Sequence, residues 1–352
     1  MSQSPAARPH TRWGRTIGIA LGAALIVGVL LLAFTWPAKT STVHNIPLAV
    51  SGPTAQVAAI TEALEAEGTF TVAPATDRAD AVAQIESRDV YGAIVLSAPP
   101  EVLTASANGA ALSQIFQAVA LQVQSQANQA AAAGAAAAGQ PAPPAVTVSV
   151  TDVVPLAATD ARGAGLASAA FPLALGGMLG GVLVSLLVVG TWRRLFALGA
   201  YTILASCLIV AVMQGWYGAL QGDAVLNLLA IALALLGTSS LIVGLNAAIG
   251  TAGIGVGAVI TLFVANPISA AAQPLQFLPE PWGAVGQWFV PGASVSLLRD
   301  LSYFPAADAL FPWLVLVGWA SAGVVLAMIG HFRNQEVVHV EGALETDVVR
   351  AA

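Results

Sequence analysis

The sequence predicts a polytopic α-helical membrane protein with six transmembrane helices and an extracytoplasmic α/β domain inserted between helices 1 and 2. Charged residues make up only 9% of the 352 residues, against about 25% in soluble domains. Hydrophobic residues make up 57% and gather in blocks about as long as the ~20 residues that cross a bilayer. Between the first two blocks lies one long segment that holds ten of the 18 acidic residues, as expected of a domain in water.

The first predicted span, 16–36, contains no charged residue. It follows a cluster of arginines and ends at Trp36 and Pro37, an aromatic interface anchor and an expected helix stop. A cleaved signal peptide is the alternative. The apolar stretch is long for a signal peptide and has no A-x-A cleavage site at its end, so an uncleaved anchor is favoured.

Five more spans follow and form a membrane domain over 167–332. Residues 226–265 run for 40 residues without a charge, too long for one helix that rises ~1.5 Å per residue, so we expect two helices folded near 246–250. The glycine-rich span 250–266 has the weakest support. The blocks are 167–191, 195–214, 225–245, 250–266 and 311–332.

Arginines beside the spans predict the orientation. Cytoplasmic loops are enriched in Lys and Arg, and with six spans all the arginine sites fall on one side. The N-terminus (1–15) and the tail (333–352) are therefore expected in the cytoplasm, and 37–166 outside. The single cysteine, Cys207, lies mid-span, and the lack of disulfides fits a bacterial cell-membrane protein. The arginines concerned are Arg8, Arg12, Arg15, Arg193, Arg194 and Arg333.

The extracytoplasmic segment alternates strand-like and helix-like patterns. The order βαβαβ predicts a small parallel sheet, and the nearly continuous apolar run 90–97 is typical of a strand buried on both faces. A third helix, 112–133, runs into an Ala/Gly/Pro-rich tract at 130–144, which we expect to be a helix end or a loop, and 145–150 could add an edge strand. The first five elements are expected at 46–51, 53–68, 69–73, 77–89 and 90–97.

Several function classes are disfavoured by what the chain lacks. Lys39 is the only lysine and has no glycine-rich approach, so a Walker A loop is excluded. The histidines share no metal-ligand spacing and the spans hold no carboxylate, so we expect no catalytic, metal or cofactor site. The acidic extracytoplasmic segment disfavours nucleic acid as a partner. The lipid bilayer is the one partner that composition requires.

Glycines recur at the spacing of close helix packing. Gly176, Gly177, Gly180 and Gly181 form two overlapping GxxxG pairs, and Gly253 and Gly257 form another. Glycine lets helix backbones approach closely. Tight packing within one molecule is the favoured interpretation, and a homodimer or a moving interface are the alternatives.

The segment 267–310 is apolar and aromatic, yet five prolines interrupt it before Leu298. Broken backbone at membrane depth must be buried in protein or face water, which favours an outer re-entrant segment with Arg299 and Asp300 at head-group level. An interfacial loop anchored by Trp282 and Trp288 is the alternative.

The whole layout resembles the type-2 ATP-binding-cassette (ABC) exporter permeases, and is most similar to their phage-infection-protein-like branch. The likeness rests on one span, an outside α/β domain, then five spans, and on short motifs. These are Phe171-Pro172-Leu173, Asn266-Pro267, Leu278-Pro279, Pro291-Gly292 and Leu298-Arg299. In the family, all of these motifs except the first belong to the outer re-entrant segment, so the resemblance implies an outer gate at Asn266, Pro267, Pro291, Gly292 and Arg299.

The resemblance implies a permease subunit that moves an amphipathic or lipid-like substrate with energy from a separate ATPase. Family exporters dock the ATPase through a coupling helix between spans 2 and 3. Here that connection is little more than 191–195, which leaves Arg193 and Arg194 as the candidate coupling residues. Two alternatives stay open: a non-transporting surface receptor or secretion-accessory protein, and, with least support, a membrane enzyme.

Overall fold

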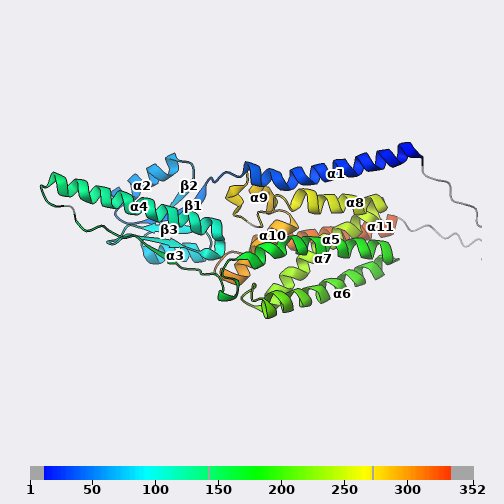
Figure 1. Cartoon of the computed structure of the whole chain (residues 1–352). Helices are drawn as coiled ribbons and strands as arrows, with labels where there is room; N and C mark the ends of the chain where they lie inside the picture. The colour runs from blue at the N-terminus through cyan, green and yellow to red at the C-terminus, as the bar shows by residue number, and fades with distance from the viewer. Residues whose placement is uncertain (1–11, 142, 272, 334–352) are drawn as a thin grey trace, which may run out of the picture.

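The computed structural model describes residues 12–141, 143–271 and 273–333. They form an α/β domain and a helical bundle placed end to end (Figure 1). Helix α1 begins and α11 ends at the end of the bundle remote from the α/β domain. Most of the N-terminal segment 1–15 and of the tail 333–352 lies outside the described residues.

Five helices of the described chain are long and apolar enough to cross a membrane. Helix α1 extends beyond Pro37, so the helix stop expected there is wrong. A proline within a helix removes one backbone hydrogen bond, which here does not end the helix. The five are α1 (Trp13–Thr40), α5 (Ala164–Leu187), α6 (Thr191–Val210, continued by η3 at Ala211–Trp216), α7 (Ala224–Ile249) and α11 (Leu310–Arg333).

The expected span at 250–266 is a shorter helix, so six full spans are not confirmed. It consists of α8 (Thr251–Val259) and the π-helical η4 (Ile260–Ala265). Fifteen residues rise only ~22 Å at ~1.5 Å each, less than the ~30 Å hydrocarbon core. After this short helix the chain is again at the end of the bundle next to the α/β domain, where the segment 267–310 contacts that domain.

Helix α7 is the centre of the bundle. It runs parallel to α5, since Gly177 lies against Thr238 and Gly181 against Ile242. The Arg333 guanidinium donates to the Ala248 carbonyl at 2.8 Å, so α7 and α11 end together. The α5–α6 turn, the end of α7 and the end of α11 therefore share one end of the bundle. The predicted grouping of these arginine sites is geometrically consistent, while their side of a membrane stays a prediction.

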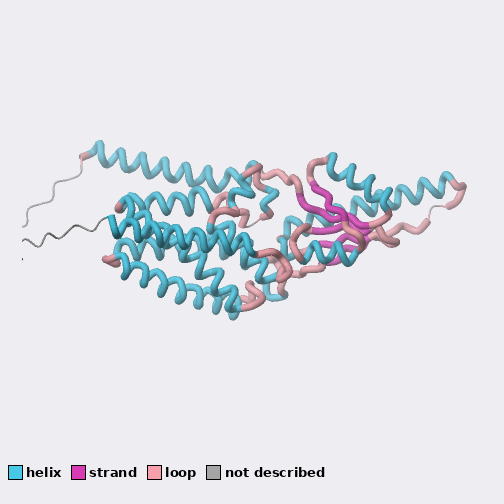
Figure 2. Tube along the Cα trace, turned by 180° about the vertical axis from the view of Figure 1, so that it is seen from behind, coloured by secondary structure: helices cyan, strands magenta, loops and turns pink. Residues whose placement is uncertain are grey.

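The α/β domain contains one five-stranded sheet in the order β2-β1-β3-β4-β5, seen in magenta in Figure 2. β1, β2 and β3 are parallel, as predicted. β4 runs antiparallel to β3, so a wholly parallel sheet is wrong: residues 96–100 are too few for a crossover. The strands are β1 (Ile46–Ser51), β2 (Phe70–Pro74), β3 (Gly92–Val95), β4 (Glu101–Thr104) and β5 (Ser149–Asp152).

Helices cover both faces of this sheet. α2 (Thr54–Ala66) and α4 (Ala110–Ala137) bury Leu64 and Phe116 against one face. α3 (Arg78–Glu86) buries Ala81 and Ile85 against the other. The Ala/Gly part of the low-complexity tract continues α4 to Ala137, one of the two outcomes expected for it.

The segment 267–310 is broken into short helices, as its prolines predict. They are η5 (Leu275–Phe277), α9 (Trp282–Gly286) and α10 (Val290–Tyr303). Helix α10 packs into the bundle core through Val295, Leu297 and Leu298. Phe277 and Phe304 from the same segment enter the two cores of the α/β domain. The segment thus belongs to both halves of the molecule.

Candidate functional site

The predicted coupling arginines lie in the first turn of α6, not in a loop. Gly190 adopts a φ of +93°, which glycine accepts readily and which allows a connection of only three residues between α5 and α6. The Arg194 guanidinium donates to the carbonyls of Val188 at 2.7 Å and Ser185 at 2.9 Å. A cation at a helix C-terminus satisfies its free carbonyls, so Arg194 caps α5. Arg193 is exposed, so its guanidinium is accessible to a partner.

The predicted glycines of α5 are covered within this one chain. A methyl group at Gly177 would lie 2.8 Å from Cβ of Thr238, and one at Gly181 would lie 2.9 Å from Cβ of Ile242. At Gly180 it would overlap the ring of Tyr201, whose hydroxyl donates to the Gly176 carbonyl at 2.7 Å. These glycines therefore let α7 and Tyr201 approach α5.

The second glycine pair has the same role between α8 and α7. A methyl group at Gly253 would overlap the Leu245 carbonyl, and one at Gly257 would meet the side chain of Ile242. Members of both predicted glycine sets thus face α7, while Gly180 faces Tyr201 of α6. A homodimer through these faces would first have to displace helices of the same chain.

A groove of about 680 Å³ opens between α5 and α6 at the end nearer the α/β domain. One end of it is polar. The Asp160 carboxylate accepts from the backbone N–H groups of Ala164 and Gly165 at 3.0 and 2.8 Å, and Thr159 donates to the Gly218 carbonyl at 2.8 Å. The apolar walls are Ala169, Pro172, Leu173, Leu208, Ile209, Val212 and Met213.

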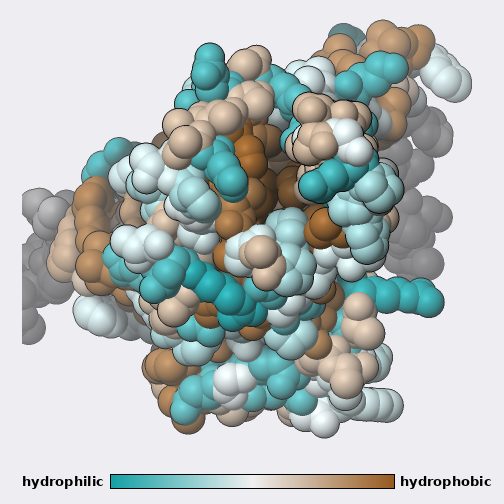
Figure 3. Space-filling model, turned by 90° about the vertical axis from the view of Figure 1, so that its left-hand side faces the viewer, coloured by the Kyte–Doolittle hydropathy of each residue, from teal (hydrophilic) through white to brown (hydrophobic). Residues whose placement is uncertain are grey.

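A second groove of about 680 Å³ lies in the α/β domain between α2, α4 and the β3–β4 turn. Figure 3, which looks onto the free end of this domain, shows an apolar hollow. No charged residue lines the groove. Its wall includes Ile60, Leu96, Pro99, Val123 and Val146.

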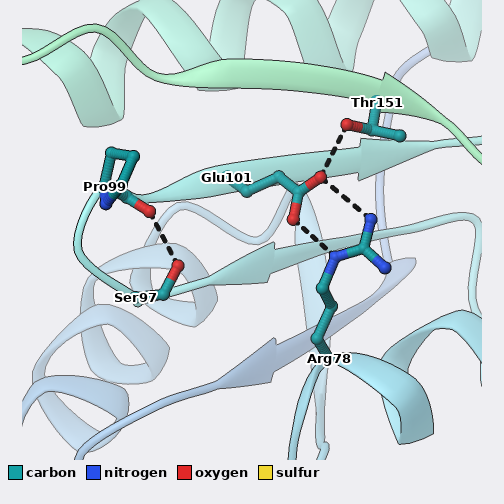
Figure 4. Close-up of polar contacts among 5 residues, drawn as sticks. All are labelled: Arg78, Ser97, Pro99, Glu101 and Thr151. Carbon is teal, nitrogen blue, oxygen red and sulfur yellow. Dashed lines mark hydrogen bonds and ion pairs between the residues drawn. The ribbon is translucent and has the colours of Figure 1, made fainter.

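A polar cluster joins β4 and the edge strand β5 of the same sheet, shown in Figure 4. The Arg78 guanidinium donates to both oxygens of Glu101, at 2.7 and 3.1 Å. The Thr151 hydroxyl donates to Glu101 at 2.6 Å. The hydrogen bond from Arg78 lowers the pKa of Glu101, against the raising effect of partial burial.

The α/β domain is fixed to the segment 267–310 by charged contacts. The guanidinium of Arg88, which follows α3, forms a part-buried ion pair with Asp300 of α10 and lies 5.2 Å from the centre of the Phe304 ring. Asn45 donates to Glu280 at 2.9 Å. Asp300 is therefore part of a domain junction, and its position at head-group level stays a prediction.

The predicted gate residues are brought close to this junction. Asn266, Pro291 and Gly292 are buried. A methyl group at Gly292 would overlap the Gly286 carbonyl, so the backbone there is closely packed. Gly292 and Arg299 line one small polar cavity, while Pro291 lines a separate apolar one. Pro267 follows directly on Asn266 at the start of the segment, and the five residues do not surround a single opening.

Sequence reasoning missed Arg88, Asn108 and Asp160. Arg88 is one of only four cations in 37–166, and its rarity was a usable signal. Asp160 precedes an apolar block, a recognised helix-start signal. Asn108 gave no signal, because its environment arises only from tertiary contacts. Among the described residues, no three His, Cys, Asp or Glu side chains lie close enough to hold a metal ion.

Comparison with known proteins identifies the family of this chain. The model for the ABC-2 family transporter protein matches residues 15–192, which cover α1, the α/β domain, α5 and the start of α6. No curated protein and no solved structure matches the chain. The match covers about half of the chain, and five described helices can span a membrane. This chain therefore belongs to the ABC-2 transporter family, whose members are the membrane-spanning components of ABC transporters and are not themselves catalytic.

Proposed function

We propose that this chain is the permease subunit of an ABC exporter of the phage-infection-protein-like branch, and that it moves an amphipathic or lipid-like substrate. A separate ATPase, the usual partner of this family, supplies the energy. The α/β domain lies outside the cell membrane and both termini lie in the cytoplasm. The arginine sites at one end of the bundle support this orientation.

The proposal of an amphipathic or lipid-like substrate rests on the groove between α5 and α6. Its walls are apolar side chains of both helices, and its end holds Thr159 and Asp160. Binding sites of ~300–1,000 Å³ with mainly apolar walls and few polar groups suit ligands of this size. An apolar chain against the walls and a polar head beside Asp160 fit this arrangement.

Narrowing the groove tests this proposal. Ala169→Trp places a large ring against the groove wall and should reduce labelling of the purified chain by a photoactivatable phospholipid at least several-fold. Ala322→Trp is the matched control, since it changes another apolar hollow, beside Trp288 and Trp319. Equal labelling of both variants and the unaltered chain would contradict a substrate role for the α5–α6 groove.

Energy coupling is proposed to enter through Arg193. Its exposed guanidinium can hold an acidic partner by bidentate hydrogen bonds, whereas Arg194 is occupied with the end of α5. Gly177 and Gly181 let α5 move closely along α7. The outer gate is proposed at Asn266, Pro267, Pro291, Gly292 and Arg299.

Single alanine variants separate docking from folding. Arg193→Ala should abolish co-purification of an ATPase in mild detergent and leave thermal stability unchanged. Arg194→Ala should lower the free energy of unfolding by about 1–2 kcal/mol, because α5 loses its cap. An ATPase retained by Arg193→Ala would overturn the assignment of Arg193. Thiol labelling at Ser87→Cys in intact cells verifies that the insertion is unchanged.

A second candidate function is a non-transporting surface receptor or secretion-accessory protein. The uncharged groove at the free end of the α/β domain favours it, as does the three-residue α5–α6 connection. If no ATPase co-purifies with the unaltered chain, and a bulky change in that groove such as Ala127→Trp abolishes partner binding, this function replaces export.

A further inference from the structure

The junction between the α/β domain and α10 contains two guanidiniums and one carboxylate. Arg88 forms an ion pair with the carboxylate of Asp300. Within the described part of the chain, Arg299 donates only to the Ala271 carbonyl, at 3.4 Å. Among the residues that the structure describes, no carboxylate lies within ion-pair distance of Arg299. The junction therefore has one positive charge in excess.

A buried amide lies beside this charge without partners. Asn108 is 4% exposed, and neither its Oδ1 nor its Nδ2 has a hydrogen-bond partner in the described structure. Both Asn108 and Arg299 line a small cavity, together with Ser269, Gln287 and Gly292. Buried polar groups are normally paired, so we expect a bound species in this cavity to pair with the Asn108 amide.

Size and charge define the occupant. The cavity measures about 20 Å³, above the ~10–15 Å³ that one water molecule needs, so it accepts one small species. Burial and, to a smaller extent, the nearby charge of Arg88 lower the pKa of Arg299 to about 10, so the group stays charged at neutral pH. Water would satisfy the amide and leave the excess charge, which is costly at this part-buried junction.

We propose that this cavity binds one small anion of about the size of chloride, held by the Arg299 guanidinium and the Asn108 amide N–H. The anion joins η1 (Ser106–Asn108) of the α/β domain to α10 and to the start of the segment 267–310. It therefore fixes the position of the α/β domain on the bundle. This site is independent of the export proposal, since it needs neither substrate nor ATPase.

An anion titration of the purified full-length chain in a neutral detergent tests this site. Replacing gluconate by chloride at constant ionic strength should raise the melting temperature by about 2 °C for each tenfold rise in chloride above half-saturation. A flat titration would show that the cavity holds water only and would overturn the proposal. Stabilisation by phosphate but not by chloride would overturn the assigned size of the anion.

Two substitutions and one control assign the response to this cavity. Asn108→Asp places a carboxylate at the cavity and should abolish the chloride response without lowering the melting temperature at low chloride. Arg299→Gln should abolish the response as well. Gln122→Glu adds the same charge at an exposed position of α4 and should respond like the unaltered chain. A full chloride response in Asn108→Asp would refute the site even if Arg299→Gln failed to fold.

Discussion

The α/β domain and the bundle around α7 both bury large side chains, but close backbone contact through small residues is concentrated around α7. In the α/β domain, large side chains fill the space between sheet and helices, and Phe116, Leu48, Ile85, Ile94 and Leu103 are fully buried. Around α7, small residues bring backbones together: a methyl group at Gly244 would overlap the Gly323 carbonyl. Ser240 donates to the Ala320 carbonyl at 3.2 Å between α7 and α11.

The difference follows from the two solvents. In water, removing large apolar side chains from solvent stabilises a fold by ~25 cal/mol per Å². In lipid that gain is absent, and close contact with interhelical hydrogen bonds has to hold helices together. The α/β core should therefore tolerate a change in side-chain shape better than a change in side-chain polarity. The α7 interfaces should be more sensitive to side-chain shape than to polarity.

The largest expected effect is a charge in the α/β core. Ile94→Asp buries an unpaired carboxylate in β3 and should lower the stability of this domain by about 3–5 kcal/mol, seen as rapid amide hydrogen exchange in β1 and β3. Ile94→Val should cost only about 1 kcal/mol. A protected sheet in the Ile94→Asp chain would mean that β3 is not central to the core.

An added methyl group should distinguish two glycines on one helix. Gly323→Ala brings Cβ against the backbone of Ser240 and Leu241 and should cost about 1–3 kcal/mol in detergent unfolding. Gly318→Ala meets no atom within 4 Å and should be neutral or stabilising by up to ~1 kcal/mol. If the two variants unfold alike, close backbone contact does not hold α11 to α7.

The smallest expected effect is a pH response of the sheet edge. Because the folded-state pKa of Glu101 is lowered, its stabilisation is present above the ordinary value of 4.5 and is lost as pH falls through the folded-state pKa. With the Arg78 side chain 50% exposed, the loss should stay below about 1 kcal/mol. Glu101→Gln should remove this part of the pH dependence, measured by amide exchange of β4 and β5.

Local patterns were enough for much of the fold. The apolar blocks predicted α1, α5, α6, α7 and α11, because length and absence of charge suffice to identify a span. Alternation and apolar runs predicted β1, β2 and β3, with α2 and α3 between them. β4 was missed because residues 101–104 form only a short strand, whose place beside β3 depends on the turn at 96–100.

The candidate site was less accessible from sequence. Both arginines of the coupling end were singled out, but only the structure separates exposed Arg193 from Arg194, which reaches the carbonyls that end α5. Likewise, the spacing of Gly176 to Gly181 predicted close packing, while α7 as the partner depends on how the helices assemble. Glycine spacing in a sequence indicates that another helix can approach closely, but it does not identify that helix.

The sequence by itself determined that the chain is a multi-pass membrane protein, that an acidic α/β domain is inserted after the first apolar helix, and that no Walker A motif is present, because each depends on composition or on residues adjacent in the chain. Tertiary structure alone decided the pairing of Arg88 with Asp300, the unpaired Arg299 beside Asn108 and the groove between α5 and α6. These join residues 191 or more positions apart in the first two cases, and burial and Coulomb interaction depend on distance in space.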